Sequence, residues 1–281
     1  NMSKAEVTDF FDNHAESWVL NGYNDDGYNY PVALHRLRII KKILSNFGSR
    51  LKIADLGCGG GNVSLALADL GHNVTGIDGA DNMIELSNTL RSSASQEIQG
   101  RVEFECSPIT DNQQESNTFD VCIAMGVIGY FEKDEELFNE VRRLLKPGGL
   151  FLVSCRNRLF NMQSISFRTA NEINKNNAVY LIDEIKTLYE RIPTDNVEDM
   201  LGRLNDVVSN LPNETAYDAN EMLSPSDKGK DGTTYKPFFE PRQHTPNQLT
   251  NAAKNCGFDN LSYHGVHPHL IDPNLNKLLP P

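Results

Sequence analysis

"IADLGCGGGN", from Ile53 to Asn62, places an aspartate two residues before a run with four glycines in five positions. Glycine is costly inside regular structure, so such a cluster marks a place where the backbone turns tightly or where something approaches it closely. A short apolar run, "LKIADLG" at 51–57, leads into the cluster, and a helical pattern, "NVSLALADLG" at 62–71, follows it. The stretch therefore predicts a strand, a tight turn and a helix.

Outward from this unit, short apolar runs alternate with helical patterns. Strands are expected at 51–57, 72–78, 101–106, 119–126 and 150–155, and helices at 62–71, 80–94 and 134–149. Strands that are apolar throughout must be covered on both faces, as in a parallel sheet with crossover helices. The predicted fold class is α/β: a Rossmann-like, doubly wound, mostly parallel sheet.

Helical segments flank this core. Residues 3–46 predict amino-terminal helices, and apolar positions on two helical faces between about Asn171 and Leu211 predict a helical hairpin inserted after the fifth strand. Residues 244–258 predict a helix that Thr245 caps and Gly257 ends, and 260–266 predict a sixth strand. The expected domains are 1–46, 47–160, 161–240 and 241–281.

The composition limits the class of protein. The formal net charge of −12 over 281 residues argues against a nucleic-acid partner, which requires a basic surface. No apolar run has the length of a membrane span, and the residues after Met2 show no signal or transit pattern. The five cysteines form no CxxC pair, which favours buried free thiols in a reducing cytosol. We therefore expect a cytoplasmic protein with no membrane partner, and the oligomeric state stays open.

The spacing of the glycines limits the ligand. A dinucleotide-binding turn would place a third glycine at position 62, where this chain has Asn62; the pattern is instead Asp55, Gly57, Gly59, Gly61. An acid in this turn repels a pyrophosphate but suits an ammonium group, with a carboxylate left for amide N–H groups and an arginine. These features fit the methionine half of S-adenosylmethionine. Asp78, at the end of the second strand, is placed to accept hydrogen bonds from ribose hydroxyls.

At this point the sequence resembles the class I S-adenosylmethionine-dependent methyltransferases over roughly residues 31–160, with a fainter echo from Phe239 to His269. "IADLGCGGGNVSLALADLGHNVTGIDGADNMIEL", "FDVCIAMGVIGYF" and "LLKPGGLFLVSCRNR" are similar to the family's motifs, in order. Within the family the chain looks most like the ubiquinone-biosynthesis type of small-molecule O-methyltransferase.

The resemblance implies a set of cofactor-binding residues. Arg36 in "LHRLRII" would hold the cofactor carboxylate, the turn would contact the methionine moiety, and the amino-terminal helices would cover the site. Asp78 would bind the ribose, and Met125 would back the sulfonium. The full implied set is Arg36, Asp55, Gly57, Cys58, Gly59, Asp78, Gly79, Met83, Ser107, Pro108, Ile109 and Met125.

The chain departs from the family pattern in three places. Ser107 stands where relatives often place an acid against the adenine amine. The ubiquinone-type enzymes have Glu-His shortly after strand four, where this chain has Gly129-Tyr130, so their substrate chemistry does not transfer. No clear counterpart of the seventh strand precedes the final "NKLLPP"; either that strand is atypical or the sequence stops before it.

Methyl transfer needs alignment, exclusion of water and sometimes a base. The candidate catalytic residues are Tyr130, His244 and His264. His264 clusters with His267 and His269, which invites a metal interpretation, but no acid or cysteine completes a ligand set nearby, so ordinary loop histidines and no metal are expected. Tyr130 fits a packing aromatic as well as a substrate contact.

We therefore expect a methyltransferase that acts on a soluble small molecule, by in-line displacement. The preference for a hydroxyl over an amine acceptor rests on the resemblance alone, and a cofactor-binding regulatory protein without turnover is the alternative. The acidic insertion after strand five should roof the acceptor pocket. Its exposed faces carry Asp183, Glu184, Glu190, Asp195, Glu198, Asp199 and Asp206, unlike a basic membrane-surface helix.

Overall fold

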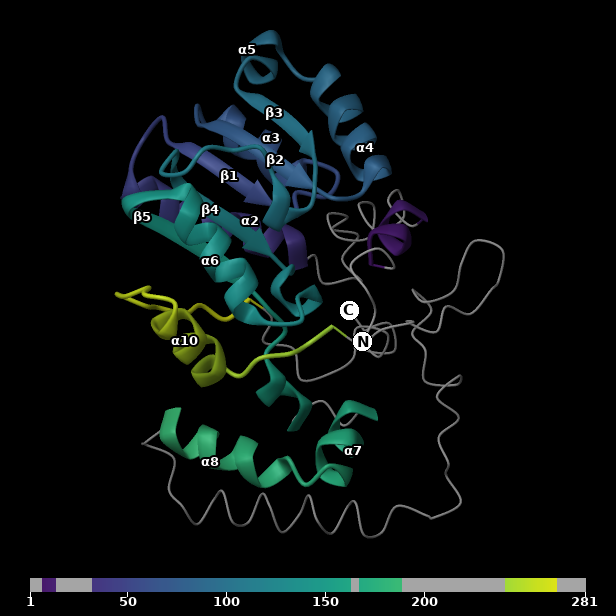
Figure 1. Cartoon of the computed structure of the whole chain (residues 1–281), viewed down its shortest axis with the longest axis vertical. Helices are drawn as coiled ribbons and strands as arrows, with labels where there is room; N and C mark the ends of the chain where they lie inside the picture. Colours follow the sequence, from purple (N-terminus) through teal and green to yellow (C-terminus); the bar gives the residue numbers. More distant parts are fainter. Residues whose placement is uncertain (1–6, 14–31, 163–166, 189–240, 267–281) are drawn as a thin grey trace, which may run out of the picture. The chain divides into compact units, whose positions relative to one another are not determined.

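The structure, a computed structural model, describes residues 7–13, 32–162, 167–188 and 241–266 (Figure 1). Contacts between residues divide them into two units. The first contains residues 7–13, 32–156 and 250–266, and the second contains 157–162, 167–188 and 241–249.

The first unit is built on a parallel sheet of five strands in the order β3-β2-β1-β4-β5 (Figure 1). The order reverses between β1 and β4, which is the switch point at which open α/β sheets bind ligands. The predicted fold class is confirmed. The strands are β1 (Lys52–Leu56), β2 (Asn73–Asp78), β3 (Val102–Cys106), β4 (Phe119–Met125) and β5 (Leu145–Ser154).

Helices connect and flank these strands. The expected helices after β1, β2 and β4 are present, and a short additional helix precedes β3. Residues 7–13 are also helical, and three 3-10 turns follow β3, β4 and β5. The bounds are α2 (Val32–Phe47), α3 (Asn62–Asp69), α4 (Asp81–Ser92), α5 (Gln96–Gln99), η1 (Ile109–Asp111), η2 (Ile128–Tyr130), α6 (Asp134–Leu144), η3 (Arg158–Met162), α7 (Phe167–Asn174), α8 (Ala178–Leu188) and α10 (Pro246–Asn255).

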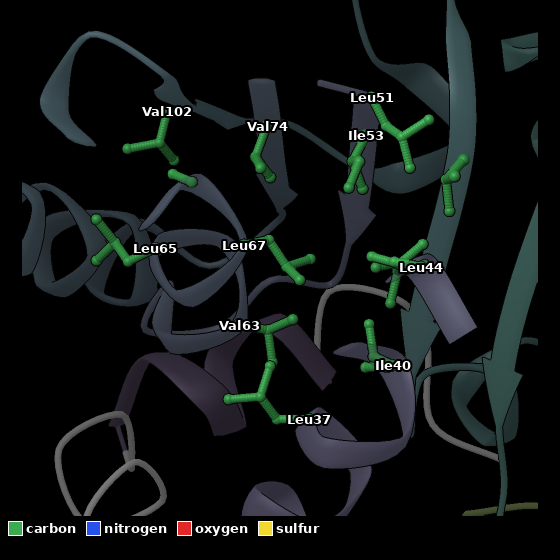
Figure 2. Close-up of a cluster of buried hydrophobic side chains, with 13 residues drawn as sticks. Leu37, Ile40, Leu44, Leu51, Ile53, Val63, Leu65, Leu67, Val74 and Val102 are labelled. Carbon is green, nitrogen blue, oxygen red and sulfur yellow. The ribbon is translucent and has the colours of Figure 1, made fainter. Parts of the chain in front are cut away.

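Apolar side chains from α2, α3 and the strands form the main core on one face of the sheet (Figure 2). Leu44 of α2, Leu67 of α3 and Ile53 of β1 are fully buried there. On the other face Phe138 of α6 packs edge-on against Phe151 of β5, with ring centroids 5.7 Å apart. Since neighbouring strand residues point to opposite faces, this two-sided packing accounts for strands that are apolar throughout.

Two predicted elements differ from the structure. The helix expected at 134–149 ends at Leu144, and β5 begins at Leu145, because Leu145 already pairs with Phe119 of β4. The sixth strand expected at 260–266 is wrong: these residues form neither helix nor strand, and Leu261 and Tyr263 are exposed. Their alternating pattern buries too little apolar surface to hold a strand against the sheet.

The helix expected near 245 is confirmed. Thr245 Oγ1 accepts a hydrogen bond from the Gln248 amide and Gln248 Oε1 accepts one from the Thr245 amide, both at 3.1 Å. This capping box starts α10 at Pro246. Gly257, with φ +83°, follows the last turn, as expected of a helix-ending glycine.

In the second unit, helices α7 and α8 are separated at Asn176, whose φ is +57°. Leu181 and Ile185 of α8 are buried, which confirms the apolar face expected for the first helix of the inserted hairpin. The second helix of that hairpin lies outside the described residues. Glu184, expected on an exposed face, is instead half-buried and accepts a hydrogen bond from the Asn247 amide at 2.9 Å.

The five cysteines, all among the described residues, are free thiols. Cys122 and Cys256 are buried, whereas Cys106 is exposed. Within the described ranges, no helix combines the length and the apolar character needed to cross a membrane.

Candidate functional site

The glycine-rich turn at 57–61 joins β1 to α3 and is fixed to the neighbouring strand. The Gly57 and Cys58 amides both donate to the carbonyl of Ile77, at 2.7 and 3.1 Å. Two of the glycines are required sterically. A Cβ on Gly57 would lie 2.5 Å from Val127 Cγ2, and one on Gly61 would lie 2.7 Å from the Phe104 ring, with φ positive at both positions.

The backbone at Gly59 faces open space. Among the described residues, a Cβ there would approach only Met83 Sδ, at 3.8 Å. Ser87 of α4 supports the turn from below, because its hydroxyl donates to the Gly59 carbonyl at 2.7 Å. The described residues therefore leave room at this turn for the close approach of a ligand, which stays a prediction.

Asp78, at the carboxyl end of β2, holds the turn and the start of α4 together. Its Oδ2 accepts from the Gly59 amide at 2.9 Å, and its Oδ1 accepts from the Ala80 amide at 3.0 Å. A carboxylate has about four acceptor sites, so Asp78 can still accept a hydrogen bond from a ligand. Burial raises the pKa of Asp78, hydrogen bonds from the Ala80, Gly59 and Gly79 amides lower it, and the nearby charge of Asp12 raises it.

Asp55 occupies a different position from Asp78. It is only 2% exposed, and its Oδ2 accepts from the Ser64 hydroxyl of α3 at 2.7 Å. Burial raises the pKa of Asp55 to about 6; the Ser64 hydrogen bond works against this shift and the charge of Asp78 adds to it. Asp55 is therefore a buried acid in β1, bonded to the helix that follows the turn.

Arg36 of α2 reaches the carboxyl end of β4. A Cβ on Gly126, the residue after β4, would lie 3.2 Å from Arg36 Nη1. The positive charge of Arg36 also acts on Tyr130 of η2 and lowers its pKa, although burial, the larger effect, raises that pKa to about 12. At neutral pH Tyr130 is thus a phenol that can donate a hydrogen bond, and it is poorly suited to remove a proton.

The residues expected around the adenine lie after β2 and β3. Met83 is buried and packs with Ala80 and with Phe11 from the helix at 7–13. The Ser107 amide donates to the Asp78 carbonyl at 3.0 Å, and the Ser107 hydroxyl donates to Glu105 Oε1 at 2.6 Å.

The other implied residues of this group lie on the connecting segments. Gly79 follows Asp78 directly, Pro108 is exposed and Ile109 begins η1, while Met125 ends β4 beside Ser154 of β5. The structure therefore brings the implied cofactor-binding residues together in the first unit, at the carboxyl ends of β1, β2, β3 and β4.

The catalytic candidates are not brought together in this way. Tyr130 lies in the first unit, at η2. His264 is exposed in the irregular segment 260–266 of the same unit. His244 belongs to the second unit, where it is buried and its carbonyl accepts from the Arg158 amide at 2.9 Å. Their catalytic roles remain predictions.

In the described part of the chain, no group of three or more His, Cys, Asp and Glu side chains has the arrangement of a metal site. His267 and His269 lie outside the described residues.

Sequence reasoning missed several supporting residues. Ser64 and Ser87 are fully buried, and each interrupts the apolar face of its helix, which is a signal that a close reading can use. Phe11 and Asp12 gave no such signal, because their contacts lie about 70 residues away in the sequence.

Known proteins are similar to this chain mainly over the segment that contains the candidate site. Residues 54–153 match the family model described as a methyltransferase domain. The chain is similar to a ubiquinone biosynthesis O-methyltransferase of Coxiella burnetii, with 29% identity over 163 residues, covering 57% of this chain and 65% of the relative. A protein of the same name from Rickettsia felis is 34% identical over 146 residues, covering 49% and 57%.

Among solved structures, the PH0226 protein of Pyrococcus horikoshii is 30% identical, covering 53% of this chain and 68% of that one, with a TM-score of 0.43. The matches to the two curated relatives span less than two thirds of their lengths. The matched segment contains the glycine turn, Asp78 and strands β2 to β4, and it runs into β5. The chain therefore carries a methyltransferase domain of the class I S-adenosylmethionine-dependent family.

Proposed function

We propose that this protein transfers the methyl group of S-adenosylmethionine to a hydroxyl group of a small molecule. The observation that carries the proposal is the position of Asp78. Its carboxylate joins the glycine turn to the start of α4 through two amide hydrogen bonds and keeps acceptor capacity for a ribose hydroxyl.

The residues around Asp78 fit the other groups of S-adenosylmethionine, the methyl donor. Arg36, beside the end of β4, pairs with the carboxylate of the methionine moiety. The open backbone at Gly59 admits that moiety, and the buried charge of Asp55 beneath the turn favours its ammonium group. Met83 and Gly79 would border the adenine, and Met125 would lie behind the reacting sulfur.

When bound, S-adenosylmethionine would supply a methyl group on a positively charged sulfur. Transfer of this methyl group to the acceptor hydroxyl would leave the electron pair of the carbon–sulfur bond on a neutral sulfur and release one proton from the hydroxyl. The protein's contribution is alignment and exclusion of water, since the leaving group needs no further activation. Tyr130, a neutral phenol held near Arg36, donates a hydrogen bond that orients the acceptor oxygen.

The acceptor is proposed to be a small compound without a lipid tail. The names of the relatives point to a quinone precursor as their substrate. This chain has Gly129-Tyr130 after β4, in place of the Glu-His of the enzymes that it resembles, and this difference favours another hydroxyl compound.

Two measurements test the proposal. Calorimetry should detect binding of S-adenosylhomocysteine to the full chain. Incubation with methyl-labelled S-adenosylmethionine and a panel of phenols, catechols and aliphatic alcohols should label at least one product. Binding without labelled product, from this panel or from extracted metabolite pools, would favour the regulatory alternative; absence of binding would reject both.

A further inference from the structure

The helix at 7–13 lies near the start of α4 (Figure 1). Two hydrogen bonds attach it there. Asp12 Oδ1 accepts from the Asn82 amide at 2.9 Å, and the Asn82 side-chain amide donates to the Asp12 carbonyl at 2.9 Å. Ala80, at the N-cap of α4, makes no side-chain capping bond. Asp12 therefore supplies, from outside the helix, the acceptor that a capping side chain normally provides to the first-turn amides.

Phe11, the residue before Asp12, contacts residues on both sides of the proposed S-adenosylmethionine site. Its side chain packs against Ala80 and Met83, which follow β2, and its ring meets the Tyr130 ring edge-on, with centroids 5.4 Å apart. Tyr130 follows β4, and β1 lies between β2 and β4 in the sheet. A side chain that contacts residues beyond both strands must lie across the carboxyl end of β1, where the glycine turn begins.

A second contact extends this cover toward the adenine side of the site. Thr8 Oγ1, one turn earlier in the same helix, lies 3.6 Å from the position of a Cβ on Gly79. The helix thus faces the segment after Asp78 with Thr8, the turn with Phe11 and the start of α4 with Asp12.

We propose that Asp12 is a positioning residue that closes the helix at 7–13 over the bound donor, with Phe11 as the cover. The inference rests on the proposed function and adds a residue to it. A ligand resting on the glycine turn lies beneath Phe11, so the helix has to open for the product to leave. Breaking the bond from the Asn82 amide to Asp12 makes opening easier and release faster.

The test uses the full chain and S-adenosylhomocysteine as the probe. Stopped-flow displacement gives its dissociation rate, and hydrogen exchange of the Asn82 amide reports directly on the capping bond. Asp12→Ala should speed dissociation about fivefold, the scale of a lost helix cap, and should abolish the protection of the Asn82 amide. Asp12→Asn keeps an acceptor oxygen and should restore both values close to wild type.

Asp9→Ala is the matched control, since Asp9 is an exposed acid on the same helix and should change neither value. Phe11→Leu keeps an apolar side chain on Met83 but removes the ring contact with Tyr130, so it too should speed release. An unchanged dissociation rate in Asp12→Ala or Phe11→Leu would overturn the inference, as would equal effects of Asp12→Ala and Asp12→Asn. If the wild type does not bind the probe at all, the proposed function itself fails.

Discussion

At the scale of single residues, the two aspartates of the glycine-turn region have different surroundings. Asp55 is buried and bonded to the Ser64 hydroxyl, whereas Asp78 is half-buried and bonded to the Gly59 and Ala80 amides. Burial is the largest cause of a raised pKa in both carboxyls. Asp78 is therefore the more exposed of the two acids, whereas Asp55 is enclosed between β1 and α3.

Replacing Asp78 by alanine should weaken the binding of S-adenosylhomocysteine by about 1–3 kcal/mol, because the hydrogen bonds from the ribose and from the turn to a charged acceptor are lost. Calorimetry measures the change. Asp69→Ala, at the exposed end of α3, is the control and should bind as the wild type does. Unchanged affinity in the Asp78 variant would remove this residue from the donor site.

Asp55 should make the stability of the first unit depend on pH. Its folded pKa of about 6 exceeds the ordinary value of 3.8, so the proton is held more tightly in the folded state. The resulting stabilisation is complete below the ordinary pKa and is lost as the pH rises through about 6. Asp55→Asn, which is always neutral, should therefore gain about 2 kcal/mol relative to wild type between pH 4.5 and 7.5.

Hydrogen exchange of the β1 amides at several pH values measures this gain, with the known pH dependence of intrinsic exchange divided out. Asp69→Asn again serves as the control, since its carboxylate is exposed. A difference between Asp55→Asn and wild type that stays constant with pH would contradict the assignment of the buried charge to Asp55.

At the scale of elements, the turn between β1 and α3 depends on two separable properties of glycine. Gly57 and Gly148 both have positive φ, at +71° and +76°. A Cβ on Gly57 would collide with Val127, whereas a Cβ on Gly148 would meet no atom of the described residues within 4 Å. Alanine substitutions at Gly57 and Gly148 therefore separate two contributions to the loss of stability: the unfavourable backbone conformation and the steric collision of the added Cβ.

Gly148→Ala should lower the free energy of unfolding by about 1 kcal/mol, the cost of a left-handed backbone for an L-residue. Gly57→Ala should lower it by about 2–4 kcal/mol, because a collision in a packed region is added. Thermal unfolding measures both. Adding Val127→Ala to Gly57→Ala should recover part of the steric cost, and failure of the double variant to recover any would argue against the Val127 contact.

At the scale of the whole molecule, the two units have separate sources of stability. The second unit holds an ion pair between the buried Glu172 and the half-buried Arg158. Glu172 accepts from Arg158 at 2.8 and 2.7 Å and from the side-chain amide of Asn161 at 3.0 Å. The hydrogen bonds from Arg158 are the largest cause of a Glu172 pKa of about 2, and burial opposes them. Because this folded pKa is depressed, the stabilisation is present above the ordinary value of 4.5 and is lost as the pH falls toward 2.

Glu172→Gln should therefore loosen the second unit selectively. Removing one partner of a buried pair leaves the other charge poorly compensated, so amides of η3 and α7 should exchange at least tenfold faster at neutral pH while the β1 amides keep their rates. Glu97→Gln, which breaks an exposed ion pair with Arg101, should change little. Equal acceleration in both units would show that they unfold together.

Features that depend on neighbouring residues were predicted correctly from the sequence, whereas features that depend on distant residues were not. Five strands, the glycine turn and the capped helix at 246–255 were predicted, because periodicity, positive φ and capping are properties of neighbouring residues. The early start of β5 at Leu145 and the absence of a strand at 260–266 were not, because strand pairing and burial are decided by distant partners.

The sequence by itself determined the α/β class, the order of the strands and the glycine turn, and it predicted that Asp55 and Asp78 belong to a cofactor site. Only the tertiary structure separated the surroundings of those two acids and showed that Ser64 bonds to Asp55 and Ser87 to the turn. It also brought Arg36 to the end of β4 and attached Asp12 to the start of α4. The physical reason is that a local pattern fixes backbone conformation within a few residues, whereas burial and hydrogen-bond partners depend on which distant segments the sheet brings together.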